Sequence, residues 1–295
     1  MSAVPVLSRS SWRQPLAYLG GLLLGGLALL TLSAPLLEQG LGVSATTVDL
    51  FSRLQPPSAQ HWLGTDELGR DVLLRLLYGG QVSLLVGLLG ALVAASIGTV
   101  LGLLAGYLGG RLDTLLMRLT DAVLALPLLP LLIVLAALDP YKLGLPPAVA
   151  ESQWFGLYRI IAIVALFGWT TVARLVRGAT LSVRERDFVQ AALSAGAGPV
   201  WIMRRHILPN VTTPIIVATT LSVGHIILLE SVLSFLGLGI QPPLPSWGNM
   251  LSNAQEMLGA APALAIYPGL LIFLTVIGCN CLGDGLQAAL AGRRR

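Results

Sequence analysis

Charged residues are scarce in this chain, and their scarcity excludes a soluble globular domain. Of the 295 residues, 11% are charged and 55% are hydrophobic, and the mean hydropathy is +0.81. Soluble domains carry about 25% charged residues, so this chain is too apolar to fold in water. The sequence therefore predicts an integral membrane protein.

Lysine, cysteine and histidine are rarer still, and their placement excludes several kinds of site. The only lysine, Lys142, lies in DPYKLG and not behind a phosphate-binding glycine-rich loop. Cys279 and Cys281 diverge by about 200° on a helix and cannot bridge. No G-x-S-x-G sequence is present. The histidines are dispersed and lack zinc-binding spacing: His61, His206 and His225. We expect no catalytic residue, no metal site and no cofactor in this chain.

Six apolar stretches are long enough to cross the roughly 30 Å hydrocarbon core of a bilayer. The first follows Arg9 and Arg13 and shows no cleavable signal, so we expect it to be retained. The third should be kinked at Pro127 and Pro130. The predicted spans are Leu16–Leu37, Gln81–Gly110, Leu112–Leu138, Phe155–Val176, Pro209 to about Leu236 and Met257 to about Leu290.

The basic residues give these six spans an orientation. With the N-terminus inside, arginines and lysines divide 13 to 5 between the cytoplasmic and external sides, as the positive-inside rule requires. The five outside are Arg53, Arg70, Arg75, Lys142 and Arg159. The basic residues form no patch with interleaved aromatic residues, so the sequence does not indicate nucleic-acid binding. We expect an all-α, six-helix domain over residues 16–290, cytoplasmic tails at 1–15 and 291–295, external loops at 38–80 and 237–256, and a cytoplasmic loop at 177–208.

The cytoplasmic loop predicts two short helices separated by a turn. Gly196 and Gly198 stop the first helix, and Pro199 can open the second. The first helix presents an apolar stripe beside the polar Gln190: Phe188, Ala191, Ala192 and Ala195. The second carries Trp201, Arg204, Arg205 and Leu208. Such a weak stripe suits a helix that docks into a groove on another protein, although a helix lying on lipid is the alternative.

The spacing of Ala191-Ala192, Gly196 and Leu208-Pro209 resembles the EAA loop of ABC importer permeases, E-A-A-x3-G-x9-I-x-L-P. Gln190 and His206 replace the glutamate and the isoleucine of that pattern. In the family this loop is a coupling helix that enters a cleft on the cytoplasmic ATPase. The resemblance implies an ATPase-coupling role for Phe188, Gln190, Ala191, Ala192, Gly196, Trp201, Arg204 and Arg205.

Two external segments carry further resemblance. HWLGTDELGRD resembles the G-T-D-x-x-G-R-D signature of C-type subunits of dipeptide, oligopeptide and nickel importers, and we expect Thr65 or Asp66 to cap an amphipathic helix there. Asp66, Arg70 and Asp71 either form a structural cluster or contact substrate. LGIQPPLPSWG resembles the peptide-permease form of the second external loop. There we expect Trp247 at the membrane–water boundary.

Four ionisable residues lie in or near the spans: Asp121, His225, Glu230 and Asp284. Such groups are costly in lipid and usually face a cavity or a partner. We expect His225 and Glu230 to line a translocation path, and Asp121 and Asp284 to be structural. An ion-coupled secondary transporter that uses Glu230, His225 and Asp284 as a relay is the alternative.

The resemblance implies a permease subunit of an ABC importer in the bacterial inner membrane, with both termini cytoplasmic. It further implies a heterodimer with a second permease, two cytoplasmic ATPase subunits or domains that hold ATP and Mg, and an external substrate-binding protein. Di- or oligopeptides are the first choice of substrate. Nickel or a metal chelate, and glutathione-like compounds, are the alternatives.

Overall fold

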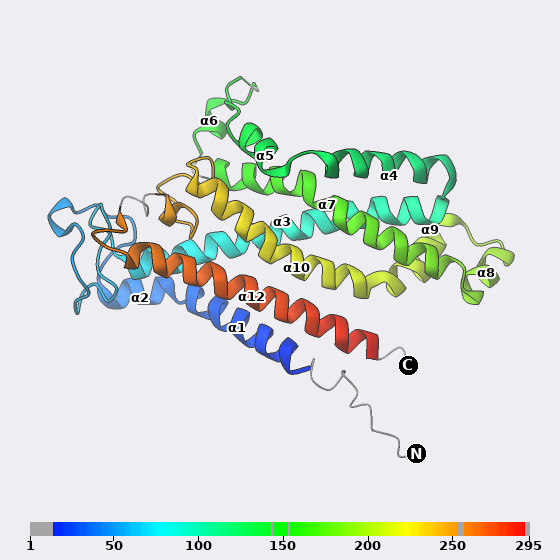
Figure 1. Ribbon diagram of the computed structural model, residues 1–295, viewed down its shortest axis with the longest axis horizontal. Helices are drawn as coiled ribbons and strands as arrows, with labels where there is room; N and C mark the ends of the chain where they lie inside the picture. Colours follow the sequence, from blue (N-terminus) through cyan, green and yellow to red (C-terminus); the bar gives the residue numbers. More distant parts are fainter. Residues whose placement is uncertain (1–13, 143, 153, 253–256, 293–295) are drawn as a thin grey trace, which may run out of the picture.

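The computed structural model describes residues 14–142, 144–152, 154–252 and 257–292, and this part of the chain is helical with one isolated bridge, Thr65 to Asp71. Figure 1 shows the long helices side by side along the long axis of the molecule. The elements are α1 Gln14–Leu32, α2 Ala34–Leu41, η1 Leu50–Ser52, α3 Val72–Leu108, α4 Gly110–Ala125, α5 Leu128–Ala136, α6 Pro147–Ala150, α7 Phe155–Arg184, α8 Asp187–Ser194, α9 Pro199–Ile202, η2 Met203–Ile207, α10 Leu208–Phe235, η3 Asn249–Leu251 and α12 Ala263–Gly292.

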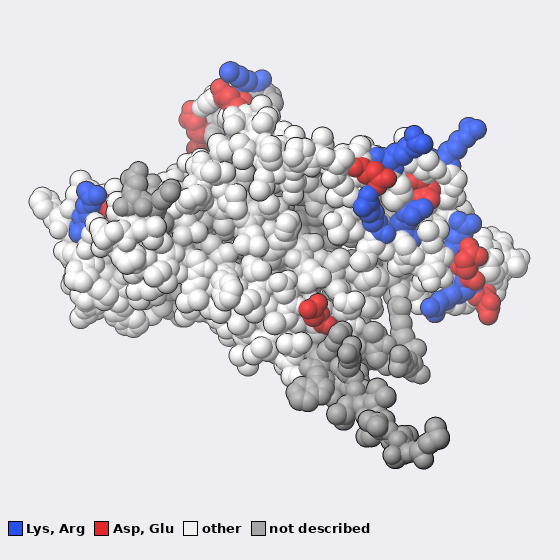
Figure 2. Space-filling model, in the orientation of Figure 1, with Lys and Arg blue, Asp and Glu red and all other residues white. Residues whose placement is uncertain are grey.

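Five of the described helices are long and apolar enough to span a membrane, and the pair α4 and α5 adds a sixth if it is counted as one span. The five are α1, α3, α7, the continuous run Pro199–Phe235, and α12. An all-α integral membrane fold is therefore confirmed. Figure 2 shows most of the Lys and Arg gathered at the end that holds α8, and few charged residues across the middle.

The third predicted span is broken rather than kinked. α4 and α5 meet at an angle of 83°. Pro127 is the cause, because a proline forces the residue before it out of the helical region, and Leu126 is extended with ψ 138°. Pro130 causes no second break, since it lies in the first turn of α5, where backbone N–H groups have no helical acceptor. The break lays α5 across α7, where Leu132 and Ala136 are buried, and carries α6 outward.

Glycines bring α3 and α7 into backbone contact. Gly98, Gly102 and Gly106 recur every four residues on the face of α3 that meets α7. A Cβ atom at Gly98 would lie 2.6 Å from the carbonyl oxygen of Trp169, and one at Gly102 would lie 2.6 Å from that of Ala173. Small residues at this spacing allow membrane helices to approach closely and gain van der Waals contact. α3 and α7 therefore form a rigid pair.

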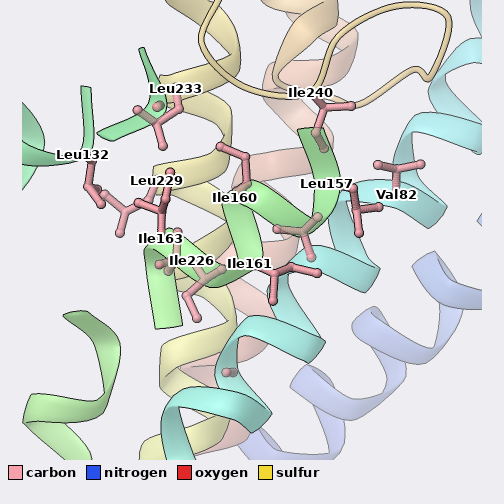
Figure 3. Close-up of a cluster of buried hydrophobic side chains, with 14 residues drawn as sticks. Val82, Leu132, Leu157, Ile160, Ile161, Ile163, Ile226, Leu229, Leu233 and Ile240 are labelled. Carbon is pink, nitrogen blue, oxygen red and sulfur yellow. The ribbon is translucent and has the colours of Figure 1, made fainter. Parts of the chain in front are cut away.

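The apolar core at the external half joins four helices. Figure 3 shows Leu132 of α5 and Val82 of α3 at opposite sides of a group that includes Ile160 of α7 and Leu233 of α10, and all four belong to one cluster of buried side chains. Gly87 of α3 lies against α10, because a Cβ there would be 2.6 Å from Ile227 Cγ1. α10 is thus held firmly to α3 at this end.

Several helix ends differ from the predicted spans. α3 begins at Val72 rather than Gln81, because the segment before Gln81 is buried and continues the helix. α7 extends to Arg184, beyond Val176, so the cytoplasmic loop begins later than 177. The first predicted span is divided into α1 and α2, so α2 occupies the start of the loop 38–80. Residues 1–13, 293–295 and part of the loop 237–256 lie outside the described residues.

Candidate functional site

The loop between α7 and α10 contains two short helices, as the sequence predicts. α8 ends at a turn where Gly196 has φ +80°, a left-handed conformation that glycine adopts at little cost. Pro199 opens α9, where its missing N–H would have no helical partner in any case. α9 then continues through the π turn η2 into α10, and this continuity was not predicted. A movement of α9 is therefore passed directly to α10.

Three buried side chains anchor this loop to the long helices. Val189 of α8, Ile202 of α9 and Ile207 of η2 are completely buried in a cluster with residues of α3, α7 and α10. The predicted stripe is divided: Ala192 is partly buried and packs against this anchor, whereas Phe188, Ala191 and Ala195 are exposed. The loop is thus fixed by one face of α8 and leaves the other face uncovered.

Gln190 also fixes the loop, through a hydrogen bond that requires the N–H donor of its amide. Its Nε2 donates to the carbonyl oxygen of Arg184 at 3.0 Å. This carbonyl is at the end of α7, where no helical N–H remains to bond it. A glutamate, which the EAA pattern has at this position, could not donate when ionised. Arg184 in turn donates from Nη1 to the carbonyl of Tyr107 at 2.9 Å, so the ends of α3, α7 and α8 are tied together.

An exposed apolar surface, here called the α8–α9 patch, covers the tip of the loop. It consists of Phe188, Ala191, Leu193, Val200 and Trp201. Val200 is 73% exposed and Trp201 is 53% exposed. Exposed charged residues border the patch: Glu185, Arg186, Asp187, Arg204 and Arg205. Exposed apolar side chains on two short helices, with exposed charged residues beside them in the chain, suit a protein interaction site.

The rings of the patch are held in place by a histidine. His206 of η2 lies between Trp201, with ring centroids 4.9 Å apart, and Phe188, with centroids 5.9 Å apart. Edge-to-face and tilted arrangements at these distances are favourable for aromatic pairs. His206, which stands in place of the isoleucine of the EAA pattern, therefore joins α8 to η2 as an apolar residue would.

At the opposite end, the segment GTDELGRD forms a compact turn and not the predicted helix. Asp66 accepts hydrogen bonds from the backbone N–H groups of Leu68 and Arg70, both at 2.9 Å. It also pairs with Arg70 Nε at 2.8 Å and Arg75 Nε at 3.2 Å, and all three side chains are buried. The prediction of a helix capped by Thr65 or Asp66 was wrong because the Asp66 carboxylate closes a turn over Leu68 and Arg70 that ends before the helix begins at Val72.

Asp71 is the residue that caps the helix. Its Oδ1 accepts a hydrogen bond from Leu74 N at 2.8 Å, and α3 begins at Val72. Its Oδ2 lies 2.9 Å from His61 Nδ1. The turn and the cap together fix the external end of α3, which supports a structural role for Asp66, Arg70 and Asp71.

Glu230 is completely buried at the external end of α10 and is surrounded by serines. Its Oε1 accepts hydrogen bonds from Ser234 Oγ at 2.7 Å and Ser246 Oγ at 2.9 Å, and its Oε2 from Ser83 Oγ at 3.3 Å. Among the described residues no cation pairs with it. These bonds join α3, α10 and the second external loop at one carboxylate.

Trp247 lies in the protein interior and not at a membrane boundary, so that prediction was wrong. It is completely buried, its backbone N–H donates to Ser83 Oγ at 3.1 Å, and its Nε1 donates to the carbonyl of Leu76 at 2.9 Å. Gly80 makes room for its ring, since a Cβ there would lie 2.7 Å from Trp247 Cζ2. The second external loop is therefore inserted between α3 and α10.

The other ionisable candidates are not collected in one site. His225 and Asp284 are exposed, whereas Glu230 is buried. Asp121 pairs with Arg174 of α7, and Asp113 pairs with Arg177 at 2.5 Å, so α4 is attached to α7 by ion pairs. The described residues contain no group of three or more His, Cys, Asp or Glu that could hold a metal ion. A relay through Glu230, His225 and Asp284 has no support in this arrangement.

A groove between α3 and α10, here called the hydroxyl groove, was not predicted. Its volume is about 680 Å³, and it lies nearer the α8–α9 end of α10 than Gly87 and Ile227, where the two helices touch. Five hydroxyl residues line it: Ser96, Thr99, Thr212, Thr219 and Thr220. Four of them donate to the carbonyl four residues earlier, while Thr99 Oγ1 is buried without a partner among the described residues. The oxygens of these four hydroxyls can still accept a hydrogen bond from a bound molecule.

Comparison with known proteins gives a consistent picture. Residues 98–295 match the family described as "Binding-protein-dependent transport system inner membrane component". A probable peptide ABC transporter permease protein, y4tQ of Sinorhizobium fredii, is 41% identical over 95% of this chain and 89% of its own length. The dipeptide transport system permease protein DppC of Alkalihalophilus pseudofirmus is 39% identical over 95% and 90%. The glutathione transport system permease protein GsiD of Shigella flexneri is 45% identical over 79% and 73%.

Proposed function

This chain belongs to the family of inner membrane components of binding-protein-dependent transport systems, and from this premise we propose that it forms half of a translocation path for di- or oligopeptides. The observation that carries the proposal is the α8–α9 patch, which is exposed, apolar and firmly tied to the spans. In this proposal two ATPase subunits or domains hold ATP and Mg, a second permease completes the path, and an external binding protein delivers substrate. The chain itself catalyses no reaction.

The proposed mechanism follows from what α10 joins: one end continues from the α8–α9 patch, and the other end holds the second external loop through Glu230. Closure of the ATPase pair on ATP binding would displace the α8–α9 patch, and the unbroken run Pro199–Phe235 would carry this displacement along the bundle. Glu230 lies about 31 Å from Pro209 at 1.5 Å per residue. Because Glu230 holds the second external loop, one helix links the ATPase contact to the external face. The ATPase must bind the loop differently in its two states, or nothing would be transmitted.

Peptides are the proposed substrates because relatives are named for peptide, dipeptide and glutathione transport. The hydroxyl groove supports this choice, since its oxygens can accept hydrogen bonds from the N–H groups of a peptide. Nickel or a metal chelate is less well supported, because no metal-binding group of side chains is present among the described residues. Glutathione-like compounds remain the second candidate.

The source of energy is the decisive test of this function. In proteoliposomes that contain this chain, the second permease and the ATPases, we expect dipeptide uptake only when ATP and the binding protein are supplied. Dissipating the proton and sodium gradients should leave uptake unchanged. Uptake driven by an ion gradient without ATP would contradict the proposal and favour a secondary transporter.

Removing hydroxyls from the groove should weaken transport. Thr219→Val keeps the shape of the side chain and removes one acceptor, a loss of about 1 kcal/mol or roughly fivefold. We expect dipeptide uptake to fall by about that factor, and the Thr212→Val, Thr219→Val double variant to fall by more than tenfold. Thr213→Val is the matched control, because Thr213 is not among the residues that line the groove. Equal uptake in all variants would remove the groove from the path.

A further inference from the structure

An open apolar crevice lies between α5, α6 and α7, away from the sites described above. Its volume is about 730 Å³. Leu138 near the end of α5, Val149 of α6, and Ile163 and Leu166 of α7 contribute to its walls. The crevice exists because α5 bends away from α4 by 83° and carries α6 with it. Figure 1 shows α5 lying against α7 and α6 projecting beyond it, nearer the end that holds the external loops.

Arg159 is the one charged residue in the lining of this crevice. Its Nη2 donates to the carbonyl of Leu238 at 3.1 Å, and its guanidinium lies over the ring of Phe155 at 5.6 Å from the centroid. Its Nε is buried and has no hydrogen-bond partner, and no carboxylate pairs with it, among the residues that the structure describes. A partly buried cation without a counter-charge is costly, and a negatively charged group beside Arg159 would lower that cost.

Along α7, the charged part of the crevice lies at the external end and the apolar walls lie deeper. Arg159 lies near the external end of the helix, and Leu166 lies seven residues further, about 10 Å deeper along the axis. Trp154 and Tyr158 beside Arg159 are exposed, and such aromatic residues favour the boundary between membrane and water. The crevice therefore has a cation at headgroup depth and apolar walls below it.

We infer that this crevice binds one anionic phospholipid of the external leaflet, with its phosphate at Arg159 and an acyl chain between α5 and α7. A guanidinium matches phosphate oxygens in a planar, charge-assisted arrangement. A carboxylate of a neighbouring protein would satisfy the charge but would leave the apolar walls beneath it uncovered. The shape therefore favours a molecule with an anionic head and a long apolar tail.

The test uses the complete complex, with its second permease and ATPases, in nanodiscs of phosphatidylcholine containing one tenth phosphatidylglycerol. Native mass spectrometry after release from the nanodiscs counts the lipids that stay bound. We expect the wild-type complex to retain phosphatidylglycerol in preference to phosphatidylcholine. Arg159→Gln should lower that retention about tenfold, which is the loss expected for a charge-assisted hydrogen bond. Ala162→Phe, which fills the crevice one turn below Arg159, should lower the retention of both lipids.

Arg118→Gln is the matched control, since Arg118 is an exposed arginine of α4 outside the crevice, and it should retain lipid as the wild type does. A photo-cross-linking residue in place of Tyr158 identifies the occupant. Cross-links to phospholipid support the proposal. Cross-links to the second permease, or equal phosphatidylglycerol retention in the wild type and in Arg159→Gln, would overturn it. Neither result bears on the peptide path, so this proposal can fail independently of the proposed function.

Discussion

Gly196→Trp is expected to lower substrate uptake at least tenfold while the complex still assembles in the membrane. Two effects combine at this position. The backbone has φ +80°, where a residue with a side chain costs about 1–2 kcal/mol, and no atom of the chain lies within 4 Å of a Cβ there. The indole would therefore project from the loop into the space beside the α8–α9 patch, where the ATPase is proposed to dock. Uptake, and ATP hydrolysis stimulated by the binding protein, are the measurements.

Gly196→Asn separates the bulk of the side chain from the strain of the backbone. Asparagine tolerates the left-handed conformation better than other residues do, and its side chain is small. We expect this variant to keep most of the uptake. Wild-type uptake in Gly196→Trp would contradict the coupling role of the loop. Equal loss in both variants would indicate that any change at this turn matters, and not the docking of a partner.

Glu230→Leu is expected to prevent the second external loop from docking between α3 and α10. The change leaves the hydroxyls of Ser83, Ser234 and Ser246 without their acceptor in a buried place. Each unsatisfied group costs about 1–3 kcal/mol, so the total approaches the free energy of unfolding of a typical domain. We expect a low yield of membrane-inserted protein and a much lower midpoint of thermal unfolding in detergent.

Two further variants test this prediction: Glu230→Gln is the conservative change at the same position, and Asp284→Asn is the control at an exposed carboxylate. Glutamine keeps the volume and one acceptor oxygen, so we expect a folded protein with altered transport and largely retained ATPase activity. Asp284 is exposed on α12, so neutralising it should change neither stability nor uptake. A Glu230→Leu protein as stable as the wild type would show that the serines find other partners and that Glu230 does not hold the loop.

Features set by neighbouring residues were predictable from the sequence. The two helices of the cytoplasmic loop follow from Gly196 and Pro199, whose backbone preferences act within a few residues. The all-α membrane fold follows from the lengths of the apolar runs. The break at Pro127 was foreseen as a kink, but its angle of 83° depends on where α5 packs, and the local sequence does not contain that information.

Features set by distant residues were not predictable. Trp247 reads as a boundary residue until its contacts with Ser83 and Leu76 are known, and these partners are more than 160 positions away in the chain. The sequence could identify an acidic cap before α3, but the choice of Asp71 over Asp66 depends on Arg75 and on the bridge between Thr65 and Asp71. The hydroxyl groove likewise requires Ser96 and Thr219 to be brought together across two helices.

The glycine contact between α3 and α7 determines which parts of this subunit can move. Helices whose backbones touch at Gly98, Gly102 and Gly106 cannot slide or roll past each other without separating, so the pair serves as a fixed frame. α10 touches this frame closely at Gly87 and Ile227, and its inner end is packed on the frame as well, through Ile207 and Val211. A force applied to the α8–α9 patch would then reach α3 and α7 together with α10, so the three helices would tilt as one body and not slide past one another.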